Sequence, residues 1–343
     1  RLDLLEDEGE KDVVRCKLAA VLEKHLGEPE RAIEIYRGVL ERNPANETAM
    51  ADLEAMIQVS EPFPTEQIAE ILLPLYDAAD NWSKRAWVNE MLLRVVEEPA
   101  RRCDLLHEIA NLHEQRGQSF EDAFAAYARA LPEDPANTTT LDALYRYADA
   151  LGIWAELVEV MERTAGSITD AELAKDTQVR VAQIYRDRLE DLPGATKAYE
   201  KASEFAPEDN AIFDALEEIY RAQSAWQPLT EVLVKKASRA TELDEKKRLI
   251  FQAAMICEEM LQEIERATEL YQEVLGLDPS DVPAVESLER LYLGLKRWND
   301  LMSIYNIKIE RAQSGDEQKE LYYVVGALQQ QELEDAFGAI ETY

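Results

Sequence analysis

Residues 194–207 read GATKAYEKASEFAP, and this stretch decides the fold because its pattern recurs along the chain. An alanine stands four residues before a tyrosine, so the two side chains lie on one face of a helix. The proline eight residues after the tyrosine ends that helix and admits the next one. The segment therefore predicts a helix that packs through a small and an aromatic residue and stops at a proline turn.

The pattern returns at an interval of 72 residues along most of the chain. The tyrosines, each with an alanine four residues upstream, are Tyr36, Tyr127, Tyr199, Tyr271 and Tyr343. The prolines are Pro44, Pro135, Pro207 and Pro279, and four tryptophans keep the same spacing at Trp82, Trp154, Trp226 and Trp298. The first tyrosine is the exception, since it precedes the second by 91 residues. A fixed period of this kind predicts a repeat architecture.

Each 72-residue period is expected to hold four helices, which make two helix hairpins. A column of small residues stands 17 residues before the tyrosines, at Ala19, Ala110, Ala182, Ala254 and Gly326. Small side chains at that position let two helices approach closely. Only 12 glycines and 13 prolines occur in 343 residues, and this scarcity of helix-breaking residues also indicates a mostly helical chain.

On these motifs the chain resembles the tetratricopeptide repeat (TPR) family, whose pattern has a small residue in the first helix, then A-x-x-x-aromatic and a terminal proline. The interval from Ala19 to Ala32 is one residue longer than in the usual pattern. The resemblance implies an all-α, right-handed superhelical solenoid of antiparallel helix hairpins. The chain is also similar to segments of the very long TPR scaffolds of bacteria, some of which accompany motility or envelope machinery.

We expect three regions. Residues 1–44 form an N-terminal hairpin with the tail of a preceding unit, 45–81 an irregular segment with one extra helix, and 82–343 a regular array cut within a repeat. In the middle region Leu53 and Leu72 both fit one leucine column and lie 19 residues apart, with the loop SEPFP between them. We expect a joint in the array there.

The charge balance limits the partners. The chain has 37 Lys and Arg against 70 Asp and Glu, a net charge of −33. This excludes a surface that coats nucleic acid, which would need positive charge, and predicts salt-sensitive attraction to a basic protein. No apolar run is long enough for membrane insertion. The three scattered cysteines favour the cytoplasm, but the periplasm stays open because the native N-terminus is expected to be absent.

No motif for nucleotide, acyl or metal chemistry is present, so the sequence predicts no catalytic residue, cofactor or metal. Cys103 and His107, four residues apart, are the nearest approach to a metal site, and ordinary packing is the favoured interpretation. His107 and His113 lie six residues apart and are expected to face different sides of their helix.

By the TPR resemblance, a protein partner, either a peptide or a helix, binds in the concave groove lined by the first helix of each hairpin. The groove residues that we expect vary from unit to unit while the packing columns stay constant. They are His107, Asn111, Arg146, Gln183, Arg221, Phe251, Met255, Arg290 and Tyr323. The alternative is that Phe251 and Met255 are simply buried between hairpins.

The sequence therefore predicts a non-enzymatic scaffold for protein–protein interaction. Two alternatives stay open. One is an RNA-processing scaffold built from half-a-TPR (HAT) repeats, and the other is a non-catalytic spacer or substrate-recruiting module of a longer enzyme. Self-association cannot be judged from the sequence.

Overall fold

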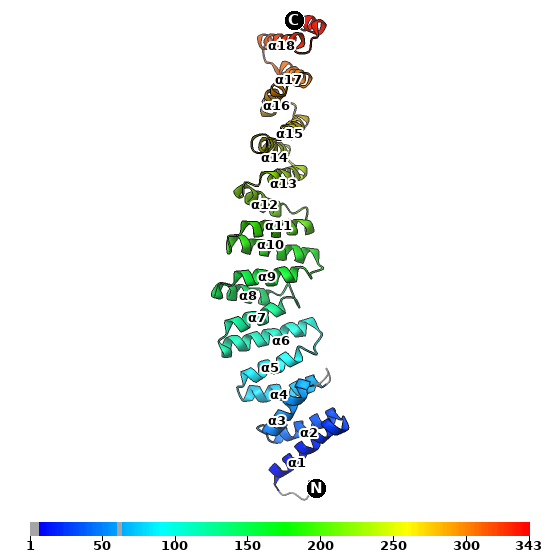
Figure 1. Ribbon diagram of the computed structural model, residues 1–343, viewed down its shortest axis with the longest axis vertical. Helices are drawn as coiled ribbons and strands as arrows, with labels where there is room; N and C mark the ends of the chain where they lie inside the picture. The colour runs from blue at the N-terminus through cyan, green and yellow to red at the C-terminus, as the bar shows by residue number, and fades with distance from the viewer. Residues whose placement is uncertain (1–6, 60–63) are drawn as a thin grey trace. The chain divides into compact units, whose positions relative to one another are not determined.

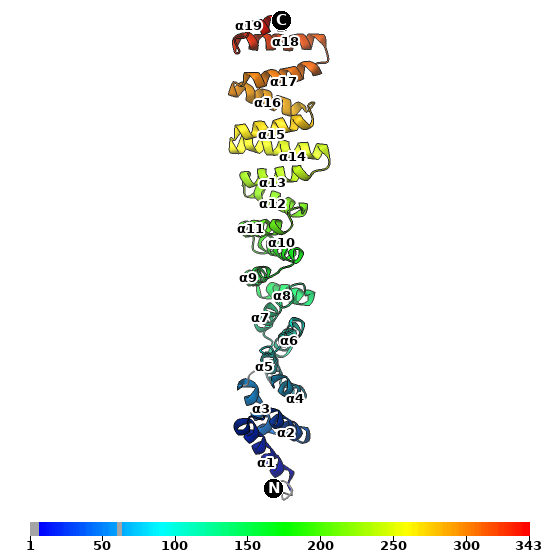
Figure 2. The ribbon, with the colours of Figure 1, turned by 90° about the vertical axis from the view of Figure 1, so that its right-hand side faces the viewer.

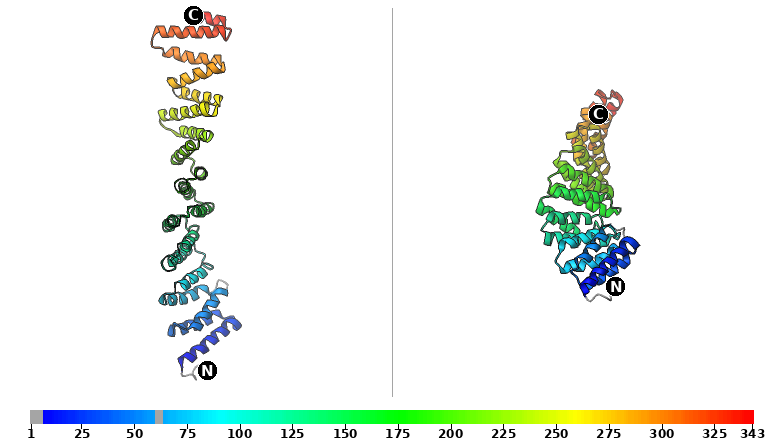
Figure 3. Two further views of the ribbon diagram at one scale, coloured as in Figure 1. Left: turned by 60° about the vertical axis from the view of Figure 1, so that its left-hand side comes forward. Right: turned by 60° about the horizontal axis from the view of Figure 1, so that its bottom comes forward.

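The computed structural model describes residues 7–59 and 64–343, and every regular element in these ranges is a helix. The chain divides into an N-terminal unit, Arg1–Leu189, and a C-terminal unit, Glu190–Tyr343. In the N-terminal unit the helices follow one another in chain order (Figures 1 and 3). They are α1 (Glu8–Val21), α2 (Pro29–Arg42), α3 (Glu47–Val59), α4 (Thr65–Ala78), α5 (Trp82–Leu92), α6 (Pro99–Leu112), α7 (Phe120–Ala130), α8 (Thr138–Leu151), α9 (Trp154–Ala165) and α10 (Ala171–Asp187).

The C-terminal unit has the same organisation (Figure 2). Its helices are α11 (Leu192–Phe205), α12 (Asn210–Ala222), α13 (Trp226–Arg239), α14 (Leu243–Ile256), α15 (Ile264–Leu277), α16 (Val282–Leu295), α17 (Trp298–Arg311), α18 (Gly315–Gln331) and α19 (Ala336–Thr342). Successive helices in each unit pack as antiparallel pairs, which confirms the all-α hairpin fold. The right-handed superhelix stays a prediction.

The small residues lie where the helices of a pair meet. The alanines of the two columns, in the first and second helices, have at most 2% of their surface exposed. They are Ala19, Ala110, Ala182, Ala254, Ala32, Ala123, Ala195, Ala267 and Ala339. At Gly326, an added Cβ would lie only 2.8 Å from the ring of Tyr343. A larger side chain in these columns would separate the two helices.

The two aromatic columns differ in burial. Tyr36, Tyr127, Tyr199 and Tyr271 are buried, as expected for core packing. Each tryptophan instead begins the last helix of its period and is only partly buried. The tryptophans therefore cover the edge of the core and do not fill it.

The four column prolines lie in the turns between the second and third helices, as predicted. Two residues after each proline, an Asn or Asp accepts a hydrogen bond from a backbone N–H at the start of the third helix. These residues are Asn46, Asn137, Asp209 and Asp281, with distances of 2.9 to 3.1 Å. The proline stops one helix and the next polar residue caps the following one.

Two more columns have a left-handed backbone, and they contain every positive-φ residue of the described ranges. The first follows the first helix of a pair: Gly27, Gln118, Glu190, Gln262 and Glu334. The second follows the third helix: Asp80, Gly152, Ser224 and Lys296. After eight of these nine residues, a backbone N–H reaches back to a carbonyl near the helix end, for example Ala225 N to Tyr220 O at 2.8 Å. These are helix-ending motifs that favour glycine, yet seven of the nine residues are not glycine.

Three of the first helices end in a π-helical turn, at Leu22–Leu26, His113–Gly117 and Cys257–Leu261. A π turn bonds each residue to the fifth one along, so it holds one residue more than an α turn. This is a physical reason for the extra residue between Ala19 and Ala32.

We predict that Lys296→Gly stabilises the C-terminal unit by about 1 kcal/mol, because a side chain in the left-handed region costs roughly that much relative to glycine. Gln262→Gly should act in the same direction. The midpoint of urea unfolding, followed by circular dichroism, measures the effect. Gly152→Ala is the opposite control and should destabilise. A lower midpoint for both glycine variants would contradict the argument.

The region expected to be a joint contains α3 and α4, and both members of its leucine pair, Leu53 and Leu72, are fully buried. Most of the loop between these helices, including Pro62, lies outside the described residues. Pro64 stands directly before α4. That this region bends the array stays a prediction.

One core position in the N-terminal unit has a polar residue. Asn89 on α5 is fully buried, and neither polar atom of its side chain has a hydrogen-bond partner among the described residues. The equivalent positions of the other periods hold the buried residues Met161, Leu233 and Tyr305. A buried amide without partners destabilises the folded state.

We predict that Asn89→Met raises the free energy of unfolding by about 1–3 kcal/mol, because it removes the unsatisfied amide and keeps an unbranched side chain. Thermal and urea unfolding would measure the gain. The matched control is Met161→Asn, which should lose a similar amount. A destabilised Asn89→Met variant would mean that the amide has a partner after all.

Candidate partner-binding surface

The expected groove residues lie on the first helix of successive pairs, within each unit. In the N-terminal unit they are His107 and Asn111 on α6, Arg146 on α8 and Gln183 on α10. In the C-terminal unit they are Arg221 on α12, Phe251 and Met255 on α14, Arg290 on α16 and Tyr323 on α18.

Two cavities occur at equivalent positions of the repeat, each between the first helix of one pair and the first helix of the next. One, of about 290 Å³, lies between α1 and α3 and is lined by Val13, Cys16, Lys17, Ala20, Asn46, Thr48 and Asp52. The other, of about 390 Å³, lies between α14 and α16 and is lined by Asp244, Lys247, Arg248, Phe251, Gln252, Asp281 and Pro283.

The linings of the two cavities correspond in register but differ in chemistry. Cys16 occupies the position of Phe251, and Lys17 that of Gln252. The first cavity is the smaller one and has no aromatic residue in its lining, whereas the second is lined by the ring of Phe251 with Lys247 and Arg248 beside it. The repeat therefore places a recess between successive first helices and lets its side chains vary.

Two of the three apolar residues of the C-terminal set are exposed to solvent. Met255 is 38% exposed and Tyr323 is 53% exposed. Phe251 is partly buried, and its ring meets that of Tyr271 edge to face with centroids 5.1 Å apart. The alternative that both residues are buried between hairpins is therefore correct in part for Phe251 and wrong for Met255.

The arginines of the set are already paired with carboxylates of their own unit. Arg146 contacts Glu114 at 2.8 Å and lies over the ring of Tyr147, and Arg290 pairs with Glu258. Arg221 pairs with Glu217 on its own helix at 2.8 Å. Acidic groups on a partner would therefore compete with carboxylates that already hold these guanidinium groups.

Sequence reasoning missed these carboxylates, although the repeat carried a signal for two of them. Both pairs combine a Glu in the π turn with an Arg 32 residues later, and the second pair repeats the first after two periods. The recurrence of the glutamate together with the arginine, at the same spacing, is the signal that predicts these two ion pairs.

Near the other end of the set, His107 is enclosed by neighbouring side chains. Its Nε2 lies 2.7 Å from Thr140 Oγ1 and 3.5 Å from Cys103 Sγ. Burial lowers the pKa of His107 and raises the pKa of the Cys103 thiol, so both are neutral near pH 7. The third neighbour is a hydroxyl group, and within residues 7–59 and 64–343 no three His, Cys, Asp or Glu residues gather as metal ligands. The contacts fit the packing interpretation.

Asn111 and Gln183 are exposed, and the Tyr127 hydroxyl donates to Asn111 Oδ1 at 3.4 Å. His113 contacts Trp82 with ring centroids 5.8 Å apart, and its Nδ1 lies 3.6 Å from Asp122. It is half-buried, whereas Leu22 and Cys257 in the same column are buried. The two histidines thus have different neighbours, as their helical spacing predicts.

Buried tyrosines beside carboxylates recur close to this surface. The Tyr36 hydroxyl donates to Asp52 at 2.9 Å and that of Tyr220 to Glu200 at 2.7 Å. Burial raises the pKa of Tyr271 to about 12, with the charge of Glu258 adding to the effect. Burial likewise raises the pKa of Tyr305 to about 12, with a contribution from Glu289.

These pKa values predict loss of stability in alkali. The folded state holds the phenol protons more tightly than the unfolded chain, whose tyrosine pKa is about 10. Their stabilising contribution is therefore complete below pH 10 and is lost as the pH rises toward 12. Absorbance at 295 nm for tyrosinate and ellipticity at 222 nm for helix should change together. In a Tyr271→Phe, Tyr305→Phe variant, unfolding should begin at higher pH. Complete ionisation near pH 10 with intact helices would contradict the prediction.

The antiparallel pairs, small-residue columns and repeated turns define a TPR-like helical repeat. No protein-family model matches the chain, and no curated protein matches it. Among solved structures, the C-terminal part of a TPR repeat-containing protein from Cytophaga hutchinsonii is 15% identical, with 74% of this chain and 98% of that chain covered and a TM-score of 0.28.

Two further similar structures are the TPR2AB domain of yeast Sti1 in complex with pHSP90 and a tetratricopeptide repeat protein from Parabacteroides merdae. The first is 16% identical, with 71% of this chain and 88% of that chain covered and a TM-score of 0.27. The second is 13% identical, with 82% and 99% covered and a TM-score of 0.23. At these values the similarity assigns no family or function, and the fold description rests on the helices of this chain.

Proposed function

We propose that the chain is a non-enzymatic scaffold that holds segments of partner proteins on the first helices of its pairs. The observation that carries this proposal is the recess found at one register position in both units, between α1 and α3 and between α14 and α16. The alanine packing columns are buried in both units, whereas the recess has Cys16 in one unit at the position that Phe251 occupies in the other. When the lining residues vary while the packing residues stay the same, one repeat fold can bind several different protein segments.

In the C-terminal unit, the surface of Phe251, Met255 and Tyr323 suits an amphipathic helix or an extended peptide with apolar side chains. The net charge of −33 favours a partner with basic residues around those side chains. Because exposed charges are screened by salt, binding should weaken as ionic strength rises.

A non-catalytic role also agrees with Cys103, because burial raises the pKa of its thiol and so disfavours the nucleophilic thiolate. None of the helices in residues 7–59 and 64–343 is long and apolar enough to span a membrane. A place in envelope or motility machinery, or in a very long bacterial TPR scaffold, stays a prediction from the family resemblance.

We predict that Phe251→Ala and Tyr323→Ala together weaken partner binding at least tenfold, because they remove both aromatic side chains of the proposed surface. The partner would be obtained by affinity capture from lysate of the source at low and high salt, with mass spectrometry. Its affinity for purified variants would then be measured by calorimetry.

The matched control is Phe205→Ala, which removes an aromatic side chain, 44% exposed, at the end of α11. It should leave the affinity unchanged. Unchanged affinity in the double variant, with circular dichroism showing intact helices, would remove the C-terminal unit's surface from the proposal.

A further inference from the structure

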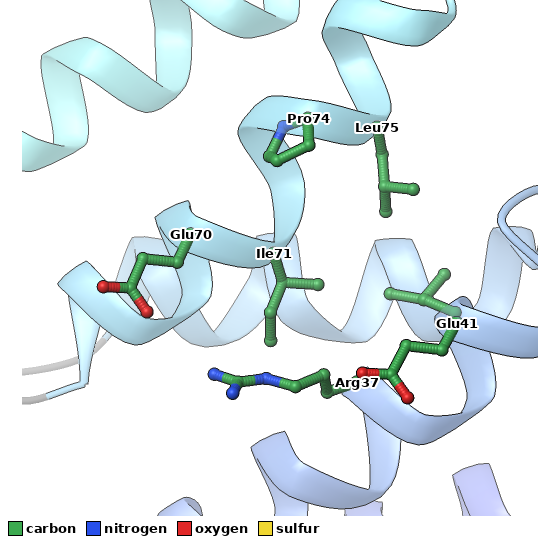
Figure 4. A pocket seen from close by; sticks show the side chains of 7 residues that line it. Arg37, Glu41, Glu70, Ile71, Pro74 and Leu75 are labelled. Carbon is green, nitrogen blue, oxygen red and sulfur yellow. The ribbon is translucent and has the colours of Figure 1, made fainter.

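A third cavity lies where the repeat is interrupted, between α2 and α4 of the N-terminal unit (Figure 4). Its volume is about 330 Å³, and it is lined by Arg37, Leu40, Glu41, Glu70, Ile71, Pro74 and Leu75. These residues come from α2, which is the second helix of a pair, and from α4, which follows α3. The cavity is therefore separate from the recesses between first helices.

The added helix is the origin of this cavity. Leu53 on α3 and Leu72 on α4 both occupy the leucine column, so α3 takes the ordinary place beside α2 and α4 follows as a second copy. Helix α2 still contacts α4 as well as α3. A second copy cannot repeat the full packing of the first, and a gap remains between the two helices.

The inner wall of the cavity is apolar. Leu40 and Ile71 are buried, and Leu75 is partly buried beside them. Figure 4 shows Ile71 and Leu75 directed from α4 into the space above α2. The volume is at the lower end of the range for ligand pockets, which is enough for one large side chain and its backbone.

Two groups that can form hydrogen bonds with a peptide border the apolar wall. They are the guanidinium group of Arg37 and the backbone carbonyl group of Glu70. The guanidinium group of Arg37 lines the cavity, and its side chain is 36% exposed, so its Nη atoms can donate hydrogen bonds to a ligand. Pro74 lies inside α4 and has no N–H, so the carbonyl group of Glu70 lacks its helical donor. A peptide backbone supplies both an acceptor for Arg37 and a donor for Glu70.

The rim of the cavity is acidic. Glu41 and Glu70 are exposed, and neither forms an ion pair within residues 7–59 and 64–343. The positive charge of Arg37 has its own neighbour in Glu34, whose Oε1 lies 3.6 Å from Nη1. The two rim carboxylates therefore favour a ligand with positive charges beside its apolar group.

We propose that this cavity binds an extended segment of a partner protein that inserts one aliphatic or aromatic side chain flanked by Lys or Arg. The inserted side chain contacts Leu40, Ile71 and Leu75, and the flanking cations lie near Glu41 and Glu70. The carbonyl group of the inserted residue accepts a hydrogen bond from an Nη group of Arg37.

The test uses the full chain and the peptide acetyl-Gly-Lys-(4-fluorophenylalanine)-Lys-Gly-amide, observed by fluorine NMR during titration. We expect saturable binding with a Kd on the order of 1 mM or below, as one buried side chain allows. The same peptide with Glu in place of Lys should bind at least tenfold more weakly. A Lys-Gly-Lys peptide, used as a competitor, measures attraction that comes from net charge alone.

Three variants locate the binding. Leu75→Arg fills the cavity with a cation and should weaken binding at least tenfold, whereas the control Leu293→Arg, at a leucine 46% exposed in the C-terminal unit, should not. Arg37→Met should weaken it up to about tenfold through loss of one hydrogen bond. The double variant Glu41→Lys, Glu70→Lys should prefer the Glu-flanked peptide.

Equal binding to Leu75→Arg and Leu293→Arg, or no saturable binding to the wild-type chain, would overturn the proposal. Sedimentation velocity tests another occupant: a wild-type dimer that Leu75→Arg converts to a monomer would show a second copy in the cavity and would also overturn it. Phe251→Ala should leave peptide binding unchanged, so failure here is distinct from failure of the first-helix surface.

Discussion

The structure depends on the close contact between the two helices of each pair. Alanine occupies that contact in both helices of nearly every first hairpin, and these side chains have almost no exposed surface. Where glycine replaces alanine at position 326, the tyrosine ring of the next helix takes the space. The alanine contact sets the distance between the two helices of a pair, and the buried tyrosines and leucines fill the core around that contact.

The constraint acts on packing and leaves the exposed first-helix positions free. The equivalent recesses of the two units therefore share a register but not a chemistry, with a cysteine in one where the other has a phenylalanine. Some of these variable positions form ion pairs within the chain, since Arg146 and Arg290 each pair with a glutamate of the same unit. Beside these paired charges, the apolar side chains of Met255 and Tyr323 stay exposed.

The helices, hairpins and small-residue columns could be predicted from the sequence because each depends on a repeated local pattern. The proline turns and the buried tyrosine column followed in the same way. The glutamate partners of Arg146 and Arg290 were missed, although the repeat carried a signal for them. The partial exposure of the tryptophans and the cavity beside Arg37 could not be predicted. They depend on which side chains meet across helices far apart in the sequence, and at the cavity on how an added helix packs where the period is broken.

The left-handed residues have a consequence for how the array can change in length. Each ends its helix through backbone hydrogen bonds that require a set number of residues, so a single inserted residue would disrupt the turn. A change of a whole helix with its connection keeps every turn as it was. The 19 residues that separate Leu53 from Leu72 have that size, and the described connection from α2 to α3 contains no left-handed residue. Length in this chain is therefore gained in steps of one helix.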